Sequence, residues 1–378
     1  MRILMLLSNP YRPDYRVEKE ARALKEKDQE VSIIAWDREG DRAAFETIDG
    51  IRIHRLGPRA GYNRTLDMIT KLPIFWLRGL LRSRKLDFEI IHAHDLDTLV
   101  LAWPLSRLRS AKLVYDAHEL YWGMIENSVP RFVRNLVERV EKWLVSKPDV
   151  VLTPTPYVAR YLGDYGAKHL ELIMNCEELR EPDRERAMEI RRKMGERKVV
   201  LYAGTLEPSK NLGTIIDVFK KIRDAEIKLV IGGTGSLVAQ VSRASEEMDN
   251  VEFIGWIPSN EMLEHVSASD LIIAVNDPRY TNIRLAVSTR LFTAMVAGKP
   301  SMVSEGTGDA EIVRTEGTGV IVRFDDVDGI KDTILELLKD EQRLDRIAEK
   351  GRIAARERYN WSIMKERLIG AYGSLQAG

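Results

Sequence analysis

The sequence predicts an α/β protein made of two doubly wound halves, each a parallel sheet covered by helices on both faces. Short apolar runs alternate with segments of helical periodicity, the alternation breaks at Leu172–Arg197, and it then restarts. A chain of 378 residues is also long for one hydrophobic core. We therefore expect one domain over 1–180, a second over 181–360, and a separate terminal helix over 361–378, with a cleft between the halves.

In the first half, strands are predicted at Arg2–Ser8, Glu30–Trp36, Glu89–Ala93, Lys112–Asp116 and Val150–Thr153. Helices are predicted at Tyr15–Lys27, Leu96–Leu108, Arg131–Val145 and Thr155–Leu162. The segment that follows Trp36 is predicted to be a polar loop. Pro104 is expected to kink or break its helix.

In the second half, strands are predicted at Val199–Ala203, Lys228–Gly232, Val251–Ile254, Leu271–Ala274, Pro300–Val303 and Gly319–Val322. Helices are predicted at Leu212–Ile222, Leu237–Glu247, Ser288–Ala297, Asp328–Lys339 and Gln342–Arg358. The last helix, Trp361–Leu375, either caps the second half or crosses back onto the first and ties the two together. Ligands of such sheets bind at the carboxyl ends of the strands, so candidate residues are sought there.

Composition excludes several classes of protein. Lysine and arginine number 58 and aspartate and glutamate 58, which speaks against a nucleic-acid footprint over the whole chain. The single cysteine, Cys176, excludes an internal disulfide and a multi-thiolate metal site. The N-terminal apolar run is too short for a signal peptide, and no apolar run reaches the ~18 residues of a membrane span. We expect a cytoplasmic protein.

Six sequence motifs follow one another along the chain: HAHDLDTL at His92–Leu99, DAHE at Asp116–Glu119, AGTLEPSKN at Ala203–Asn211, VIGGTGS at Val230–Ser236, FIGWIP at Phe253–Pro258 and TRLFTAMVAGKPSMVS at Thr289–Ser304. The ordered set resembles the retaining glycosyltransferases of family four. The resemblance implies the glycosyltransferase-B fold, with two Rossmann-like domains facing across a cleft. It also implies that the second domain holds a nucleotide-diphosphate sugar, that the first holds the acceptor, and that no metal or other cofactor is required.

The resemblance assigns the catalytic roles to His118 and Lys210. His118 follows the strand that ends at Asp116, and the matching family histidine lies beside the donor sugar. Lys210 follows the strand Val199–Ala203, and its family match contacts the donor diphosphate. A lysine there would offset the negative charge that develops on the leaving group in the absence of a metal. The alternatives are a structural histidine and a solvated loop lysine.

The donor-binding residues are predicted in two loops and in the first part of one helix of the second half: Gly204, Thr205, Lys210, Gly233, Gly235, Ser288, Thr289, Arg290 and Thr293. The glycines of the turn after Lys228–Gly232 allow close approach of a ligand, although a purely structural turn is the alternative. Ser288 is expected to be the N-cap of a helix that ends at Gly298 and whose free amides bind phosphate.

Two positions depart from the family pattern. The family places an arginine where this chain has Thr205, and we hypothesise that Arg290 substitutes for it. The family also shows two glutamates at the positions of Leu285 and Thr293, the second of which is expected to bind the ribose hydroxyls. A threonine cannot accept from both hydroxyls as a carboxylate can, so donor binding would lose about 1.5–3 kcal/mol.

Acceptor contacts are predicted for Asn9, Asp14, Arg16 and His94, with helix capping as the alternative for Asp14. Strand alternation points His92 and His94 to the same face of the sheet. Together with Asp95 and Asp97 they could suggest a metal site, but a capping role for Asp95, or a first-turn position for Asp97, is the better interpretation.

The segment Arg59–Lys85 is basic and interleaved with apolar residues, namely Tyr62, Phe75, Trp76, Leu77, Leu80 and Leu81. A cationic amphipathic helix suits a membrane surface and would suit a lipid-linked acceptor. The alternative is a helix that packs on the core and has a solvated basic face.

The preferred function is transfer of a sugar, with retention, from a nucleotide-diphosphate donor to a hydroxyl of a glycan or lipid-linked acceptor. A nucleotide-sugar epimerase is an alternative enzyme, although it would need several carboxylates for proton transfer. A non-catalytic partner of an active transferase is an alternative of another class, and the departures at Thr205, Leu285 and Thr293 are its support.

Overall fold

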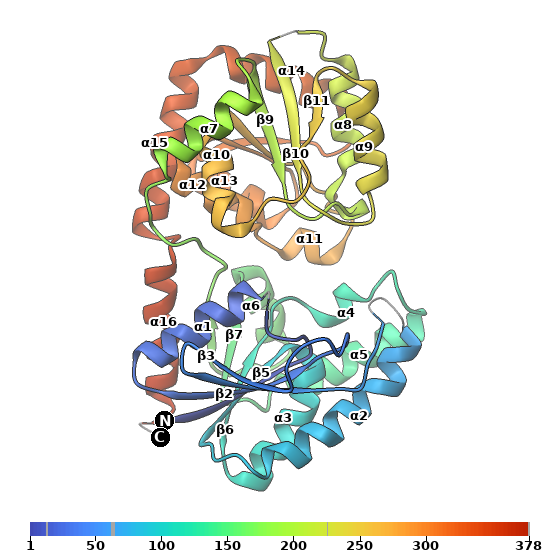
Figure 1. Cartoon of the computed structure of the whole chain (residues 1–378), viewed down its shortest axis with the longest axis vertical. Coiled ribbons are helices and arrows are strands. Elements are labelled where there is room, and N and C mark those ends of the chain that lie inside the picture. The colour runs from blue at the N-terminus through green and yellow to red at the C-terminus, as the bar shows by residue number, and fades with distance from the viewer. Residues whose placement is uncertain (13, 62–64, 225, 377–378) are drawn as a thin grey trace. The chain divides into compact units, whose positions relative to one another are not determined.

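The computed structural model describes residues 1–12, 14–61, 65–224 and 226–376 (Figure 1). The chain divides into two compact units. The first unit comprises Met1–Met174 and Met364–Gly378, and the second comprises Asn175–Ile363.

The first unit is built on an eight-stranded sheet with the order β3-β4-β2-β1-β5-β6-β7-β8. Its strands are β1 (Arg2–Leu7), β2 (Glu30–Trp36), β3 (Phe45–Ile48), β4 (Ile51–Leu56), β5 (Ile90–His94), β6 (Lys112–Asp116), β7 (Val150–Thr153) and β8 (Leu170–Leu172). Every neighbouring pair is parallel except β3 and β4. The continuous apolar runs of the inner strands are buried on both faces, as a parallel sheet requires.

The helices of the first unit are α1 (Tyr15–Glu26), α2 (Thr65–Ser83), α3 (Asp95–Arg109), α4 (Tyr121–Met124), α5 (Arg131–Leu144) and α6 (Pro156–Asp164), together with the C-terminal helix α16 (Trp361–Ser374). Helix α3 contacts both α2 and α5, so these three form one layer on one face of the sheet (Figure 1). Helices α1 and α16 lie on the opposite side (Figure 1). Right-handed crossovers produce this division, because α1 connects strands in the opposite direction along the sheet.

Helix α16 packs within the first unit from residue Met364 onward. Its Lys365 forms an ion pair with Glu26 of α1, and its Met364 sulfur accepts the backbone N–H of Met174. Of the two placements left open by the sequence, the structure has the C-terminal helix on the first unit. Cys176, the second residue of the second unit, is buried.

One expectation for the first unit is wrong. The polar loop predicted after Trp36 contains the hairpin β3–β4, whose turn residues Asp49 and Gly50 both have positive φ (52° and 76°). The Asp-Gly pair was a hairpin signal, and exposure of β3 explains why its apolar pattern is weak. Of the two expectations for Pro104, a break is excluded, because helix α3 continues through Pro104 to Arg109, and a kink stays a prediction.

The second unit has a six-stranded parallel sheet with the order β11-β10-β9-β12-β13-β14. Its strands are β9 (Lys198–Ala203), β10 (Ile227–Gly232), β11 (Val251–Phe253), β12 (Leu271–Ala274), β13 (Ser301–Ser304) and β14 (Gly319–Val322). Its helices are α7 (Arg184–Met194), α8 (Leu212–Lys221), α9 (Val238–Glu247), α10 (Met262–Ser267), α11 (Thr281–Leu285), α12 (Thr289–Ala297), α13 (Gly308–Glu316), α14 (Val327–Lys339) and α15 (Glu341–Glu357). Apolar clusters fill both faces of the sheet.

The glycine turn after β10 packs directly against the loop that follows β9. Gly233 has a φ of 151°, and a Cβ atom there would lie 1.8 Å from the carbonyl oxygen of Gly204. Gly235 has a φ of 152°, and its Cβ would lie 2.5 Å from the oxygen of Leu206. Backbone bonds join the two loops, with Leu206 donating to Thr234 (2.9 Å). The glycines are therefore required by the protein's own backbone.

We predict that Gly233→Ala destabilises the second unit by about 3 kcal/mol, because a Cβ must displace the backbone of Gly204 as well as adopt an unfavourable φ. Gly195→Ala is the matched control: Gly195 also has a positive φ (84°), but a Cβ there meets nothing within 4 Å. The control should cost only about 1 kcal/mol. Thermal unfolding of both variants measures the difference, and equal losses would contradict the steric explanation.

Candidate active site

Three side chains meet at the carboxyl ends of β5 and β6, where the sequence predicted a site. His94 ends β5, Asp116 ends β6, and His118 follows two residues later. The carboxylate Oδ2 of Asp116 lies 3.0 Å from His118 Nε2 and 3.2 Å from His94 Nδ1. The two imidazoles lie 3.1 Å apart through the same nitrogens. His118 keeps 23% of its side chain exposed, whereas Asp116 is fully buried.

Arg16 of α1 holds Asp116 from the interior. Its Nε and Nη2 donate to the two carboxylate oxygens at 2.8 and 2.6 Å, and its Nη1 donates to the carbonyl of Ile173 at 2.6 Å. Arg16 Nε also lies 3.2 Å from Glu20, one helical turn along. Because the guanidinium is buried and fully engaged, these contacts give Arg16 a structural role, and acceptor binding by it stays a prediction.

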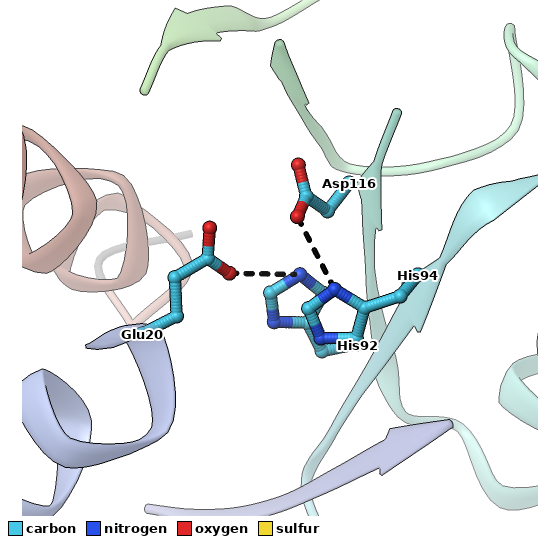
Figure 2. A group of neighbouring side chains, drawn as sticks. All are labelled: Glu20, His92, His94 and Asp116. Carbon is cyan, nitrogen blue, oxygen red and sulfur yellow. Dashed lines mark hydrogen bonds and ion pairs between the residues drawn. The ribbon is translucent and has the colours of Figure 1, made fainter. Parts of the chain in front are cut away.

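Two more polar side chains, Glu20 and His92, lie next to His94 and Asp116 (Figure 2). His92 and His94 point to the same face of β5, as alternation predicts, and their rings stack with centroids 4.1 Å apart. His92 Nε2 lies 3.8 Å from Glu20, and His92 Nδ1 lies 2.7 Å from the hydroxyl of Tyr372 in α16. Glu20 and Tyr372 were not predicted, since neither belongs to a motif and each comes from a distant part of the chain.

Four of these residues offer metal-ligand atoms within 4.8 Å of one another: Glu20, His92, His94 and Asp116. Their surroundings are not those of a metal centre, because the Arg16 guanidinium already contacts both carboxylates. A divalent ion would have to displace that buried cation from Asp116. We therefore interpret the cluster as an ion-pair network, and metal independence of the reaction stays a prediction.

The three histidines of the network differ in the direction of their pKa shifts. Burial by itself lowers the pKa of His118, but Asp95 and Asp116 together raise it to about 10. Burial lowers the pKa of His94 despite its contact with Asp116, and burial and the neighbouring His94 lower that of His92 further. Burial and the nearby Asp116 raise the pKa of Glu20 to about 8. Of the three histidines, His118 is thus the one that is charged at neutral pH.

We predict that the imidazole of His118 stays protonated at pH 8 while that of His92 is neutral at pH 6. Stabilisation from the raised pKa of His118 is complete below its ordinary value of 6.5 and is lost as pH rises through about 10. Imidazole NMR of the protein, which has six histidines, measures both groups. His118→Gln serves to assign the signal, and a His118 that titrates near 6.5 would contradict the network.

In the second unit, Arg290 of α12 lies beneath the loop that follows β9. It is buried, with its guanidinium carbon 4.5 Å from the ring centroid of Tyr202 and its Nη2 donating to Asn276 at 3.1 Å. Its Nη1 is buried without a hydrogen-bond partner among the described residues. A Cβ on Gly204 would lie 3.8 Å from this guanidinium. Arg290 thus lies beside Gly204, the residue before Thr205, and its substitution for the missing arginine stays a prediction.

A buried carboxylate, Asp309 at the start of α13, completes this group. It accepts the backbone N–H of Ser288 at 2.7 Å. Burial raises the pKa of Asp309, and Ser288, Arg290 and Lys210 act against that shift. Lys210 and Arg290 therefore both lie close enough to influence one carboxylate. Sequence reasoning missed Asp309, although Thr307, which caps α13 through the Ala310 amide, marked the start of a helix.

The other predicted donor residues lie in the β9–α8 loop and in the first turns of α12. Ser288 is the N-cap of α12 and Gly298 its left-handed C-cap, as predicted, but the Ser288 hydroxyl makes no capping bond. Thr289 is exposed in the first turn, and Thr205 is exposed in the loop, its carbonyl accepting from Tyr202. The hydroxyl of Thr293 is occupied by the carbonyl of Thr289 at 3.0 Å.

Leu285, at the other position of a missing glutamate, is half-buried in α11. Neither Leu285 nor Thr293 therefore presents an acid for ribose, and no other residue is seen to replace them within the described part of α11 and α12.

Two of the four predicted acceptor residues, Asn9 and Asp14, lie in the β1–α1 connection, whereas Arg16 lies in α1 and His94 ends β5. Asp14 caps α1 by accepting the amide of Val17 at 3.2 Å, and Asn9 Nδ2 donates to Asp14 at 2.7 Å. Capping, the alternative for Asp14, is thus present. Asp95 is not a cap: α3 has His94 at its N-cap position, and Asp95 lies in the first turn, with Oδ1 accepting the amide of His118 at 3.3 Å. Asp97 also lies in that first turn, as predicted.

This fold and these two groups of residues define a glycosyltransferase of the glycosyltransferase-B class, and comparison with known families agrees. The model of the family described as "Glycosyl transferases group 1" matches residues 183–354, and that of the "Glycosyl transferase 4-like domain" matches residues 13–176. The chain belongs to the group 1 glycosyltransferases of family four, which use nucleotide-sugar donors.

Curated relatives are distant but extensive. A GDP-mannose-dependent alpha-(1-6)-phosphatidylinositol monomannoside mannosyltransferase of Mycobacterium tuberculosis is 25% identical over 305 residues, covering 74% of this chain and 76% of the relative. An uncharacterized glycosyltransferase of Bacillus subtilis, YqgM, is 25% identical over 303 residues, covering 78% and 80%.

Solved structures share the fold. A sucrose-phosphate synthase from Thermosynechococcus elongatus superposes with a TM-score of 0.85 at 20% identity, over the whole of both chains. Anabaena HepE in complex with UDP-glucose superposes with a TM-score of 0.76 at 16% identity, over 99% of this chain and 100% of that one.

No helix in the described part of the chain is both long and apolar enough to cross a membrane.

Proposed function

We propose that this protein transfers a sugar, with retention of its anomeric configuration and without a metal, from a nucleotide diphosphate to a hydroxyl of a glycan or lipid-linked acceptor. The observation that carries the proposal is the buried Arg290 guanidinium, which has an unused N–H beside the β9–α8 loop. A buried cation without a full set of partners is a strong anion site.

The donor diphosphate would bind between Lys210, Arg290 and the first amides of α12. Lys210 is half-buried in the short turn Pro208–Lys210, and the N-terminus of α12 adds positive partial charge. Together these groups would stabilise the charge that the diphosphate gains as the glycosidic bond breaks. The leaving diphosphate would then help to deprotonate the acceptor hydroxyl.

His118 would act from the first unit as a cation beside the sugar. Its raised pKa keeps the imidazolium charged at neutral pH, and Asp116 fixes its orientation. An imidazolium that is charged at neutral pH stabilises negative charge rather than removing a proton, which fits a role toward the sugar phosphate. Loss of the ribose-binding acid at Thr293 implies that the diphosphate and the sugar supply most of the donor affinity.

The acceptor and the location are further parts of the proposal. A lipid-linked acceptor is supported by the phosphatidylinositol mannoside that appears in the names of several relatives. Helix α2, in the basic stretch Arg59–Lys85, exposes Ile74, Leu77 and Leu81 and would contact the inner surface of the cytoplasmic membrane. Tyr62, counted in that stretch, lies outside the described residues.

We predict that Arg290→Ala weakens binding of UDP or GDP about 10- to 100-fold, since a charged hydrogen bond contributes roughly 1.5–3 kcal/mol. Arg284→Ala, which removes an exposed arginine of the neighbouring α11, is the control and should bind as wild type. Thermal-shift titrations with both nucleotides, followed by sugar-nucleotide hydrolysis assays, provide the measurement.

An unchanged donor KM and kcat in Arg290→Ala would reject the assigned role of this residue. If no nucleotide stabilised the wild-type protein at all, the non-catalytic partner would be the better interpretation of the fold.

A further inference from the structure

Helix α5 carries three large apolar side chains that are at least half exposed among the described residues of the first unit. Phe132, Leu136 and Trp143 are exposed by 74, 60 and 52%. At 100° per residue these positions fall within an arc of about 40° on one side of the helix. We call these three side chains the α5 ridge. Single exposed apolar residues are ordinary, but three large ones aligned on one helix mark a binding surface.

Helix α5 and the helices of its layer are rich in basic residues. Residues 131–147 contain five basic residues and two acidic ones, and one of the acids, Glu141, is buried. Residues 71–85, which include most of α2 in the same layer, contain five basic residues and no acidic one. The end of α3 adds Arg107 and Arg109. A chain with no net charge thus concentrates cations on the layer formed by α2, α3 and α5.

The packing of this layer keeps α5 in place. Trp143 meets Trp103 of α3 edge to face, with centroids 4.8 Å apart, and Lys147 lies 5.2 Å from the Trp143 ring. Trp143 is therefore anchored on one edge while half of it remains exposed. An amphipathic aromatic ring of this kind, next to cations, is typical of side chains at the boundary between headgroups and acyl chains.

We propose that the α5 ridge inserts into the headgroup region of an anionic lipid bilayer, with the basic residues of α2, α3 and α5 binding the lipid phosphates. A second copy of the chain is a poorer occupant, because a twofold contact would bring the same cations of both copies together. The inference deepens the proposed lipid-linked function, but vesicle binding requires neither nucleotide nor acceptor. Its failure would therefore leave the proposed transfer reaction standing.

The test is flotation of the full chain with vesicles of phosphatidylcholine alone or mixed with phosphatidylglycerol. We expect binding only to the mixed vesicles, and weaker binding in high salt. The double variant Phe132→Gln/Leu136→Gln should lower binding about tenfold. The matched control Met188→Gln/Ile353→Gln replaces two exposed apolar residues on helices of the second unit and should bind as wild type.

Three outcomes would overturn the proposal. The wild-type protein could fail to float with either vesicle, or the α5 double variant could float as wild type. The α5 variant could instead convert a dimer of the wild-type chain to a monomer in sedimentation equilibrium, which would assign the ridge to a second copy. A matched variant of α2, Leu77→Gln/Leu81→Gln, separates the helices: loss of binding in it alone would assign the contact to α2 and contradict the role of α5.

Discussion

A buried guanidinium must be neutralised or solvated by dipoles, and Arg16 and Arg290 meet that constraint differently. Arg16 is neutralised within its own unit, where Asp116 takes two of its hydrogen bonds and Glu20 lies at ion-pair distance. Arg290 has a neutral amide, Asn276, and an aromatic face as partners, and one of its N–H groups is unused among the described residues. The first arrangement is complete and structural, whereas the second is suited to receive an anion.

The parallel sheets explain why functional groups gather where they do. Their strand ends meet at one edge, so His94 and Asp116, 22 residues apart, come within 3.2 Å. In the second unit the same geometry brings the β9–α8 loop against the glycine turn and over Arg290. The glycine turn supports the β9–α8 loop because backbone contacts leave no room for a Cβ. Rigid loops of this kind can hold charged side chains in position for a transition state.

Helix α16 contributes a side chain to the histidine cluster at the ends of β5 and β6 in the first unit. The hydroxyl of Tyr372, in the last turn of α16, lies at hydrogen-bond distance from His92, and the ring of His92 stacks on that of His94. Tyr372 is therefore connected through His92 to the predicted acceptor residue His94. Helix α16 therefore contributes a polar contact to this cluster as well as covering apolar surface. It also places a phenol, two imidazoles and two carboxylates in one buried group, whose polar atoms depend on one another for compensation.

Repetition of strand and helix predicted the two parallel sheets well, because burial on both faces produces continuous apolar runs. The hairpin β3–β4 was missed because its outer strand is exposed and carries little apolar signal. His118, Lys210 and Arg290 could be singled out since they lie in motifs at strand or helix ends. Glu20, Asp309 and Tyr372 could not, because their partners are set by tertiary packing rather than by spacing in the sequence.

The central claim concerns the place where a diphosphate binds, and a crystal structure with bound UDP or GDP tests it most directly. The account predicts diphosphate oxygens at about 3 Å from the Arg290 guanidinium and the Lys210 ammonium, with the first amides of α12 facing them. A nucleotide that occupies another surface of the second unit, with Arg290 still buried away from its phosphates, would contradict the account.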